Sequence, residues 1–274
     1  MNKKQIVSIE ELAFLMNSKE NQTYAKELLS LIYDELEKAD VEKILLTAAH
    51  SLYARGLLNF NQQTKEMQLQ PSIEKLFNTM CNPQLSLLLQ KVDFINETTI
   101  TANIYIDNTS NVTYQSLDGI AHKIEEISDD RLFLESKNLL QLVFQQEEKG
   151  SNIVGTLPNH IVQNIEKLFP LSIQEGKTTL IENGFNSLYA ENFIMDLKTT
   201  QSIYTIIRLD TTEKNEVISN NGFFVIESTN TQWLLTRNII NDSFDITYLT
   251  KNLFENEIAK LIKHQSFKTG VYLY

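Results

Sequence analysis

The sequence predicts an α+β fold in which one or more antiparallel sheets pack with helical bundles. Helical periodicity fills the first third of the chain, β-branched runs follow, and helices and strands then recur before a last helix. This order differs from the strict alternation of strand and helix that builds a doubly wound sheet. With 274 residues, 42% hydrophobic and 22% charged, the chain can bury a sizeable core.

Capping signals and apolar stripes predict the first three helices. Ser8 and Glu11 form a capping box, which predicts a helix from Ser8 to about Met16. Apolar residues at helical spacing predict a second helix over residues 24–37. Asp40 is expected to cap a third helix, because its side chain can accept a hydrogen bond from a free amide of the first turn. The two stripes are Leu28, Leu29, Ile32 and Leu36, then Val41, Ile44, Leu45, Ala48 and Leu52.

Gly56 is expected to end the third helix in a left-handed conformation. A polar stretch over residues 59–70 then leads to Pro71, which suits the first turn of a helix. This fourth helix is expected to end at Asn82-Pro83. The first third of the chain is therefore predicted to be helical.

The pattern then changes to short runs rich in β-branched and aromatic residues. Residues 99–106 and 112–117 are predicted to form a hairpin. Residues 122–127 and 131–135 are predicted to form a second hairpin of the same antiparallel sheet, and Leu139 to begin another helix.

A polar segment over residues 147–151 marks the expected boundary between an N-terminal half, residues 1–149, and a C-terminal half, residues 150–274. The two are expected to pack as one globular unit, and the order of elements leaves open two pseudo-symmetric halves. The second half is predicted to hold helices over 158–168 and about 178–189, strands over 203–209, 223–227, 233–236 and 244–247, and a last helix from Leu253 to Ile262.

Charge and composition exclude several classes of protein. The net charge of −11 would repel a polyphosphate partner at long range. The N-terminus does not read as a signal peptide and no apolar run reaches membrane-spanning length, so we expect a cytoplasmic protein without membrane insertion. The single cysteine, Cys81, precludes an intrachain disulfide and is interpreted as a structural thiol.

No group of residues in the sequence indicates catalysis, a metal or a cofactor. The four histidines fall on four separate predicted elements, and the eight glycines include no phosphate-binding loop. The paired acids Glu125-Glu126 and Asp129-Asp130 are expected to be a solvated strand edge and a turn. An enzyme with dispersed catalytic residues stays open as a rival class. The histidines are His50, His122, His160 and His264.

A second rival is a winged-helix transcriptional regulator. Helices and Gly56 over residues 41–77 could build such a unit. It would need a basic face for DNA, which the net charge of −11 disfavours. That face would include Lys43, Arg55, Lys65 and Lys75.

Several segments, taken in order, resemble the EspG-type chaperones of type VII (ESX) secretion. The first is Ala-His-Ser-Leu-Tyr-Ala-Arg-Gly-Leu-Leu at 49–58, followed by a helix and Asn82-Pro83. The second half is similar too, with a proline-started helix from Leu157-Pro158 to Phe169-Pro170. Its remaining matches are the strands at Phe223–Ser228 and Trp233–Leu235, and the closing strand and helix within Phe244–Lys263.

This resemblance implies an EspG-like fold and a non-enzymatic cytoplasmic chaperone that keeps a type VII secretion substrate soluble for export. The chain is rich in Lys, Asn and Ile, so it looks most like the EsaE-type toxin chaperones of low-GC Gram-positive bacteria. The implied partner is a secreted toxin or a WXG100/LXG-like helical protein, with no nucleic acid involved.

The C-terminal segment is the candidate partner-binding site. Its apolar residues follow the last predicted helix, and no further element is predicted that would bury them. The alternative is that they fold back onto the core. These residues are Phe267, Val271, Tyr272, Leu273 and Tyr274.

Overall fold

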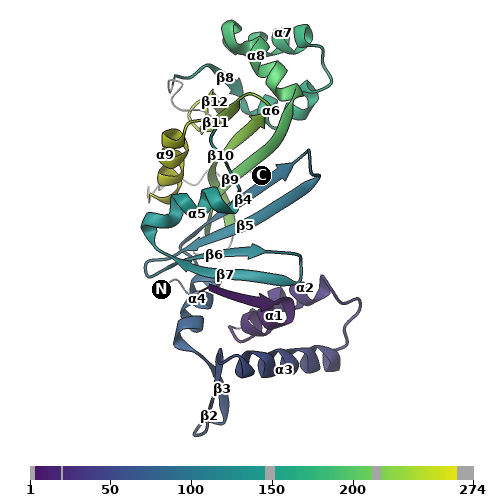
Figure 1. Ribbon diagram of the computed structural model, residues 1–274, viewed down its shortest axis with the longest axis vertical. Coiled ribbons are helices and arrows are strands. Elements are labelled where there is room, and N and C mark those ends of the chain that lie inside the picture. The colour runs from purple at the N-terminus through teal and green to yellow at the C-terminus, as the bar shows by residue number, and fades with distance from the viewer. Residues whose placement is uncertain (1–3, 20, 146–151, 212–216, 264–274) are drawn as a thin grey trace. The chain divides into compact units, whose positions relative to one another are not determined.

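The structure, a computed structural model, describes residues 4–19, 21–145, 152–211 and 217–263 (Figure 1). The chain divides into two compact units. The predicted boundary at residues 149 and 150 lies outside the described residues and stays a prediction. Unit 1 comprises Met1–Leu88, Thr101–Leu132 and Asp210–Ile218; unit 2 comprises Leu89–Ile100, Phe133–Leu209 and Ser219–Tyr274.

The sheet of unit 1 has the strand order β1-β7-β6-β5-β4. Its β1–β7, β7–β6 and β6–β5 pairs are antiparallel. The predicted hairpin over residues 99–106 and 112–117 is confirmed as β5 and β6, with Ile104 opposite Thr113. The strands are β1 Lys4–Ser8, β4 Leu85–Asp93, β5 Thr98–Ile106, β6 Asn111–Ser116 and β7 Ala121–Ile127.

Four helices accompany this sheet: α1 Ile9–Asn17, α2 Gln22–Ser30, α3 Lys38–Ala54 and α4 Pro71–Cys81. The capping box is confirmed, since the Glu11 amide donates to the Ser8 hydroxyl and the Glu11 carboxylate accepts from the Ser8 amide. Gly56 has the expected left-handed backbone, with φ +69°. α1 packs against α2 and α3, and these helices share a core with β1, β6 and β7 around Leu12, Leu52 and Phe77.

The predicted ends of the second and third helices are wrong. α2 ends at Ser30 instead of residue 37, because Ile32 of the stripe is exposed and Glu35 has a left-handed φ of +45°. α3 begins at Lys38, so Asp40 lies within its first turn instead of at its cap. There the Asp40 carboxylate still complements the positive end of the helix dipole.

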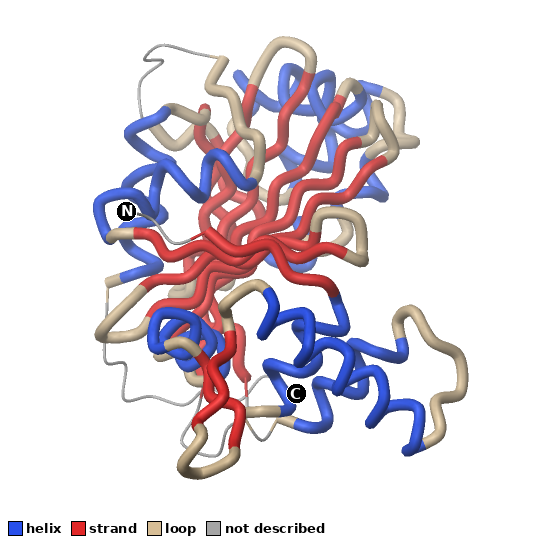
Figure 2. Tube along the Cα trace, turned by 60° about the horizontal axis from the view of Figure 1, so that its bottom comes forward, coloured by secondary structure: helices blue, strands red, loops and turns tan. Residues whose placement is uncertain are grey.

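The stretch over residues 59–70 is a hairpin instead of a connection. β2 Leu58–Asn61 and β3 Glu66–Leu69 pair as a separate two-stranded sheet, with Phe60 opposite Met67. Figure 2 shows this hairpin as a pair of red strands that extends beyond the rest of unit 1. Its turn is fixed by the Asn61 side chain, which accepts from the amides of Gln63 and Thr64.

The predicted second hairpin is also wrong. Residues 129–131 form a 3₁₀ turn and Leu132–Leu139 form helix α5, while β7 pairs with β6 and β1. Two aspartates in the first turn favour a helix start here, which the alternation of residues 131–135 does not reveal. The helix expected to begin at Leu139 ends there instead, and Gln141 follows with φ +54°.

The sheet of unit 2 has the strand order β4-β9-β10-β11-β12-β8, and the β10–β11, β11–β12 and β12–β8 pairs are antiparallel. The four predicted strands of this half are confirmed as β9 to β12. The strands are β8 Gly155–Pro158, β9 Thr200–Thr211, β10 Val217–Ser228, β11 Gln232–Asn238 and β12 Ser243–Tyr248.

Besides α5, nearly all of which belongs to unit 2, the helices of this unit are α6 Asn159–Val162, α7 Ile173–Glu182, α8 Ser187–Lys198 and α9 Lys251–Ile262. The last helix is confirmed as α9. The helix predicted over 158–168 is α6 followed by a 3₁₀ turn at Ile165–Leu168, and the one predicted near 178–189 is two helices, α7 and α8. Asn183 caps the end of α7, and Gly184, at φ +93°, turns the chain away from the helix before α8 begins.

A buried polar group anchors α8 to the sheet of unit 2. The Asp196 carboxylate accepts from the Trp233 indole at 2.9 Å and from the Ser228 hydroxyl at 2.9 Å. Trp233 is fully buried and packs edge-on against Phe193.

The observed architecture confirms the predicted α+β class, with antiparallel pairing and helical bundles. Within the described part of the chain, none of the helices has the length and apolar character needed to span a bilayer.

Candidate functional site

The candidate site at the C-terminus lies outside the described residues, so its role stays a prediction. It comprises Phe267, Val271, Tyr272, Leu273 and Tyr274. Two other features of the described residues are candidates for binding a partner: a groove in unit 1, and the exposed apolar side chains of unit 2.

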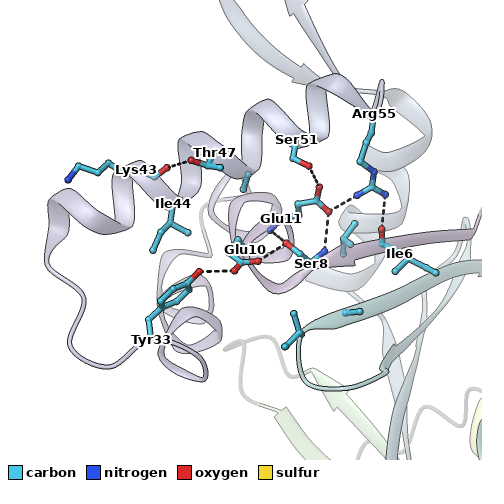
Figure 3. Close-up of a pocket in the computed structure, with 14 residues that line it drawn as sticks. Ile6, Ser8, Glu10, Glu11, Tyr33, Lys43, Ile44, Thr47, Ser51 and Arg55 are labelled. Atoms are coloured by element: carbon cyan, nitrogen blue, oxygen red, sulfur yellow. Dashed lines mark hydrogen bonds and ion pairs between the residues drawn. The ribbon is translucent and has the colours of Figure 1, made fainter.

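The groove of unit 1 has a volume of about 580 Å³ (Figure 3). Its walls come from β1, the start of α1, one face of α3, the turn before β7, and Tyr33. The exposed side chains of Ile6 and Ile120 line it, together with Ile44 and Ala48 of α3. A volume of this size is typical of sites that bind small ligands or a few side chains.

Glu11, the first of two carboxylates in the groove, holds the unit together. It is only 4% exposed and accepts from Ser51 Oγ at 2.7 Å and Arg55 Nη1 at 2.6 Å, in addition to the Ser8 amide. Arg55 Nη2 donates to the Ile6 carbonyl of β1 at 2.7 Å. The Glu11 charge is therefore neutralised, and its oxygens join α1, α3 and β1.

Glu10, the second carboxylate, accepts hydrogen bonds from two side-chain hydroxyls of the described residues. Its Oε2 accepts from Ser8 Oγ at 2.7 Å, and its Oε1 accepts from the Tyr33 hydroxyl at 2.8 Å (Figure 3). Burial acts to raise the pKa of Glu10, but the hydrogen bonds from Ser8, its own amide and Tyr33 outweigh burial and lower it. Glu10 is therefore ionised at neutral pH and faces a groove with apolar walls.

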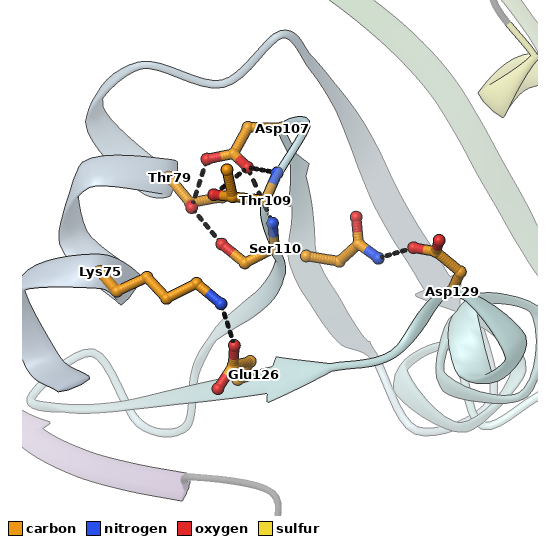
Figure 4. A network of polar contacts seen from close by, with 8 residues as sticks. Lys75, Thr79, Asp107, Thr109, Ser110, Glu126 and Asp129 are labelled. Carbon is orange, nitrogen blue, oxygen red and sulfur yellow. Dashed lines mark hydrogen bonds and ion pairs between the residues drawn. The ribbon is translucent and has the colours of Figure 1, made fainter.

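A second, more polar cleft is formed by the β5–β6 turn and the end of β7 (Figure 4). The Asp107 carboxylate accepts from the Thr79 hydroxyl at 2.6 Å and from the Ser110 amide at 2.8 Å. Lys75 pairs with Glu126 at 2.7 Å, and Asn111 donates to Asp129. These contacts fix a turn and join α4 to the sheet. They explain why acidic residues gather here, and no bound ligand is needed as an explanation.

The remaining candidates from the sequence are the cysteine and the histidines. Cys81 is half-buried with Sγ 3.6 Å from Met16 Sδ, and burial raises the pKa of its thiol. His122 is buried with Nδ1 2.9 Å from the Tyr114 hydroxyl, and burial lowers its pKa. His50 and His160 are exposed, and His264 lies outside the described residues. No cluster of metal-ligating side chains occurs among the described residues.

The basic face that DNA binding would need is largely paired with carboxylates. Lys43 lies 3.3 Å from Asp40, and Arg55 and Lys75 make the ion pairs with Glu11 and Glu126 given above. Lys65 lies in the turn between β2 and β3. This geometry gives the winged-helix alternative no support.

The exposed apolar surface of unit 2 includes the tip of the β4–β5 hairpin. Phe94 and Ile95 are 47% and 65% exposed. The tip is rigid, because the Asp93 carboxylate accepts from the amides of Ile95 at 3.1 Å and Asn96 at 3.0 Å, and the Phe94 amide donates to the Gln201 carbonyl of β9 at 2.9 Å. The amide of Asn96, its side chain and Lys91 lower the pKa of Asp93 to about 2.

The helical pair α7 and α8 exposes further apolar side chains. Leu188 and Met195 are seven residues apart on α8, which places them on one face of the helix, and Leu188 is 80% exposed. Ile173 and Ile181 of α7 are also exposed. In the sequence, the hairpin tip could have been recognised from two apolar residues between Asp93 and Asn96. The exposed face of α8 could not, because Leu188 and Met195 fit a buried stripe equally well.

No protein-family model matches this sequence, and no curated protein sequence matches it. The structure is similar to that of the Mycobacterium tuberculosis type VII secretion system chaperone EspG5, solved in complex with a PE25-PPE41 dimer. The TM-score is 0.66 at 6% sequence identity, and the match covers 95% of this chain and 96% of that chain. The EspG-like fold expected from the sequence resemblance is therefore confirmed.

Proposed function

We propose that this chain is a non-enzymatic cytoplasmic chaperone that binds a helical type VII secretion substrate and keeps it soluble for export. The carrying observation is the fold, which matches the chaperone EspG5 over almost the whole of both chains. A match of this extent includes both units and leaves little of the chain to form an added catalytic domain.

The chemistry of the described residues supports a role in binding. The acids, the thiol and the buried histidine considered above make contacts within the fold. Exposed apolar side chains, in contrast, are abundant on the hairpin tip and on α7 and α8. Interfaces are rich in aromatic and aliphatic side chains at their centre and poor in charge there. Chaperoning a helical segment requires such a surface.

The proposed client is an LXG-type or nuclease toxin, or a WXG-like helical partner of such a toxin. This choice follows from the resemblance of the sequence to EsaE-type chaperones. It is tested by affinity purification of the chain from its native cytoplasm, with the secretion system expressed, followed by mass spectrometry. Recovery of a toxin or a WXG-like protein is the expected result; recovery of neither would contradict the proposal.

We place one client contact at Phe94 and Ile95, because a rigid tip loses little conformational entropy on binding. Replacing both with Ser is expected to weaken client retention at least about tenfold, since exposed anchor residues commonly contribute more than about 1 kcal/mol each. A matched control replaces Ile239 and Ile240 with Ser; these lie in the β11–β12 turn and are 63% and 94% exposed. Equal retention by both variants would rule out the tip as an anchor.

The C-terminal residues are proposed as a second contact. Truncation after Lys263 removes Phe267 and the four apolar residues at 271–274 together. The truncated chain is expected to keep its circular dichroism spectrum and to retain less client. Unchanged client retention would assign these residues no part in binding.

A further inference from the structure

The groove of unit 1 contains two adjacent glutamates in opposite electrostatic situations. Glu11 is buried and pairs with Arg55 at 2.6 Å. Glu10 is partly exposed and, among the described residues, lies within ion-pair distance of none of the cations. Lys43, the other cation of the lining, pairs with Asp40 at 3.3 Å instead.

The surroundings of Glu10 strengthen its attraction for an incoming cation. Apolar side chains of β1, α3 and the turn before β7 line the groove, and they reduce the effective dielectric constant near the carboxylate. Tyr33, Lys43, Glu11 and Arg55 also line the groove, and Asp118 and Glu10 both act on His122, which is buried with a lowered pKa and is therefore neutral at pH 7. Glu10 thus carries a negative charge with no ion-pair partner among the described residues, at the wall of an apolar groove.

The hydrogen bonds already made by Glu10 leave it able to accept at least one more. Ser8 donates to Oε2, Tyr33 donates to Oε1, and the amide of Glu10 itself donates to the same carboxylate, which has four lone pairs in all. The two hydroxyl donors also hold the carboxylate in one orientation. A guanidinium, with its several donors in one plane, can pair with a carboxylate held in this way.

We propose that this groove binds a segment of the client polypeptide in which an Arg, flanked by apolar side chains, pairs with Glu10. The inference rests on the proposed function and specifies the client segment. The volume of about 580 Å³ accommodates a few side chains, and the apolar side chains of Ile6 and Ile120 in its lining can contact the residues that flank the Arg. The net charge of −11 further attracts a locally basic segment.

The test uses the purified full-length chain and a synthetic probe, and it does not require the client. The probe is a fluorescein-labelled 12-residue peptide of Ala, Gln and Leu with a central Leu-Arg-Leu. A second peptide carries citrulline, the neutral isostere of Arg, in place of the Arg. Fluorescence anisotropy is expected to show the Arg peptide binding about tenfold or more tightly than the citrulline peptide, as for a charge-assisted hydrogen bond.

Glu10→Gln is expected to abolish the difference between the two peptides, because the amide has the same shape without the charge. Glu66→Gln, on the exposed strand β3 of the same unit, removes an identical charge outside the groove and is expected to leave the difference unchanged. Thr47→Arg, on the exposed face of α3, supplies a competing guanidinium within the groove and is expected to weaken the Arg peptide at least tenfold.

Three outcomes would overturn the inference. They are equal affinity of the wild-type chain for both peptides, a difference that persists in Glu10→Gln, and displacement of the Arg peptide by spermidine at equal concentration. The last would indicate a site for a small polycation. A change in sedimentation mass on Glu10→Gln would instead assign the groove to a second copy of this chain. If the native client is recovered while the peptides fail to discriminate, this inference fails and the proposed function stands.

Discussion

At the scale of single residues, the ion pair of Glu11 and Arg55 joins several elements of unit 1. Three elements converge on the Glu11 carboxylate, and Arg55 extends the contact to the β1 backbone. Removing one member of such a pair leaves a buried charge without compensation, which costs more than the pair itself contributes.

Arg55→Ala is therefore expected to lower the free energy of unfolding by about 2–4 kcal/mol. Lys43→Ala, which breaks the exposed pair with Asp40, is the matched control and is expected to change it by less than about 1 kcal/mol. Urea denaturation followed by circular dichroism measures both. Similar small losses for the two variants would show that Glu11 is solvated in solution.

Asp93 provides a test that depends on pH. Its pKa is about 2, lowered first by the Asn96 amide and then by the Asn96 side chain and Lys91. A carboxyl whose pKa is depressed in the folded state contributes stability above its unfolded value, near 4, and loses it as the pH falls through about 2. The hairpin tip is thus expected to keep its geometry down to about pH 3.

Titration of the Asp93 carboxyl carbon by NMR is expected to give a midpoint of about 2. Asn96→Ala removes the side-chain donor and keeps the backbone donor, so the midpoint is expected to rise part of the way toward an unperturbed aspartate. A wild-type midpoint near 4 would mean that the turn contacts are not maintained in solution.

At the scale of elements, α3 ends at a glycine whose left-handed conformation the sequence predicts and the structure confirms. Gly56 has φ +69°, and a Cβ there would meet nothing within 4 Å. The cost of a side chain is therefore conformational only. Gly56→Ala is expected to destabilise the chain by about 1 kcal/mol and Gly56→Asn by less, because Asn tolerates the left-handed region.

Gly222→Ala serves as the contrasting case for thermal or urea unfolding. A Cβ at Gly222 would lie 2.6 Å from the Ile206 carbonyl oxygen of β9, and backbone cannot rotate away as a side chain can. A loss of about 2 kcal/mol or more is expected, from steric overlap. If Gly222→Ala cost no more than Gly56→Ala, the close approach of β10 to β9 would be wrong.

The elements that the sequence predicts correctly have strong local signals. The capping box at Ser8, the proline at 71 and the Gly56 stop each act within one helical turn. The elements missed depend on distant partners. β4 begins Leu-Ser-Leu-Leu-Leu, which fits a helix as well as a strand, and residues 131–135 alternate like a strand but form the start of α5.

The candidate site was harder to predict for the same reason. The capping box distinguishes Glu11 from Glu10 in the sequence, but their different roles in the groove depend on Arg55, Ser51 and Tyr33, between 23 and 44 residues away. The C-terminal residues chosen from the sequence lie outside the described residues and stay a prediction. The EspG-like resemblance could be recognised because it depends on the order of elements, which local signals largely preserve.

At the scale of the whole molecule, each unit has its own core, yet two strands of one hairpin are divided between the units. β4 and β5 each contribute residues to unit 1 and unit 2. Neither unit can unfold completely without removing part of a strand from the other. We therefore expect one cooperative transition in spite of the two cores.

Trp233, the single tryptophan of the chain, lies in the core of unit 2 and makes this expectation measurable. Its fluorescence should change at the same urea concentration as the helical circular dichroism signal. Leu52→Ala, in the core of unit 1, is expected to lower both midpoints together, with a cost of about 2–5 kcal/mol. A shift in the circular dichroism midpoint alone would show that the units unfold independently.

The contact between Cys81 and Met16 ties the end of α4 to α1 through two sulfur atoms. Because the thiol is unique, half-buried and less acidic than usual, a maleimide dye should attach to one position only, and slowly. The rate of attachment then measures how often these two helices separate and expose the thiol. Slower labelling in the presence of client would show that the client closes unit 1, with no need to locate where it binds.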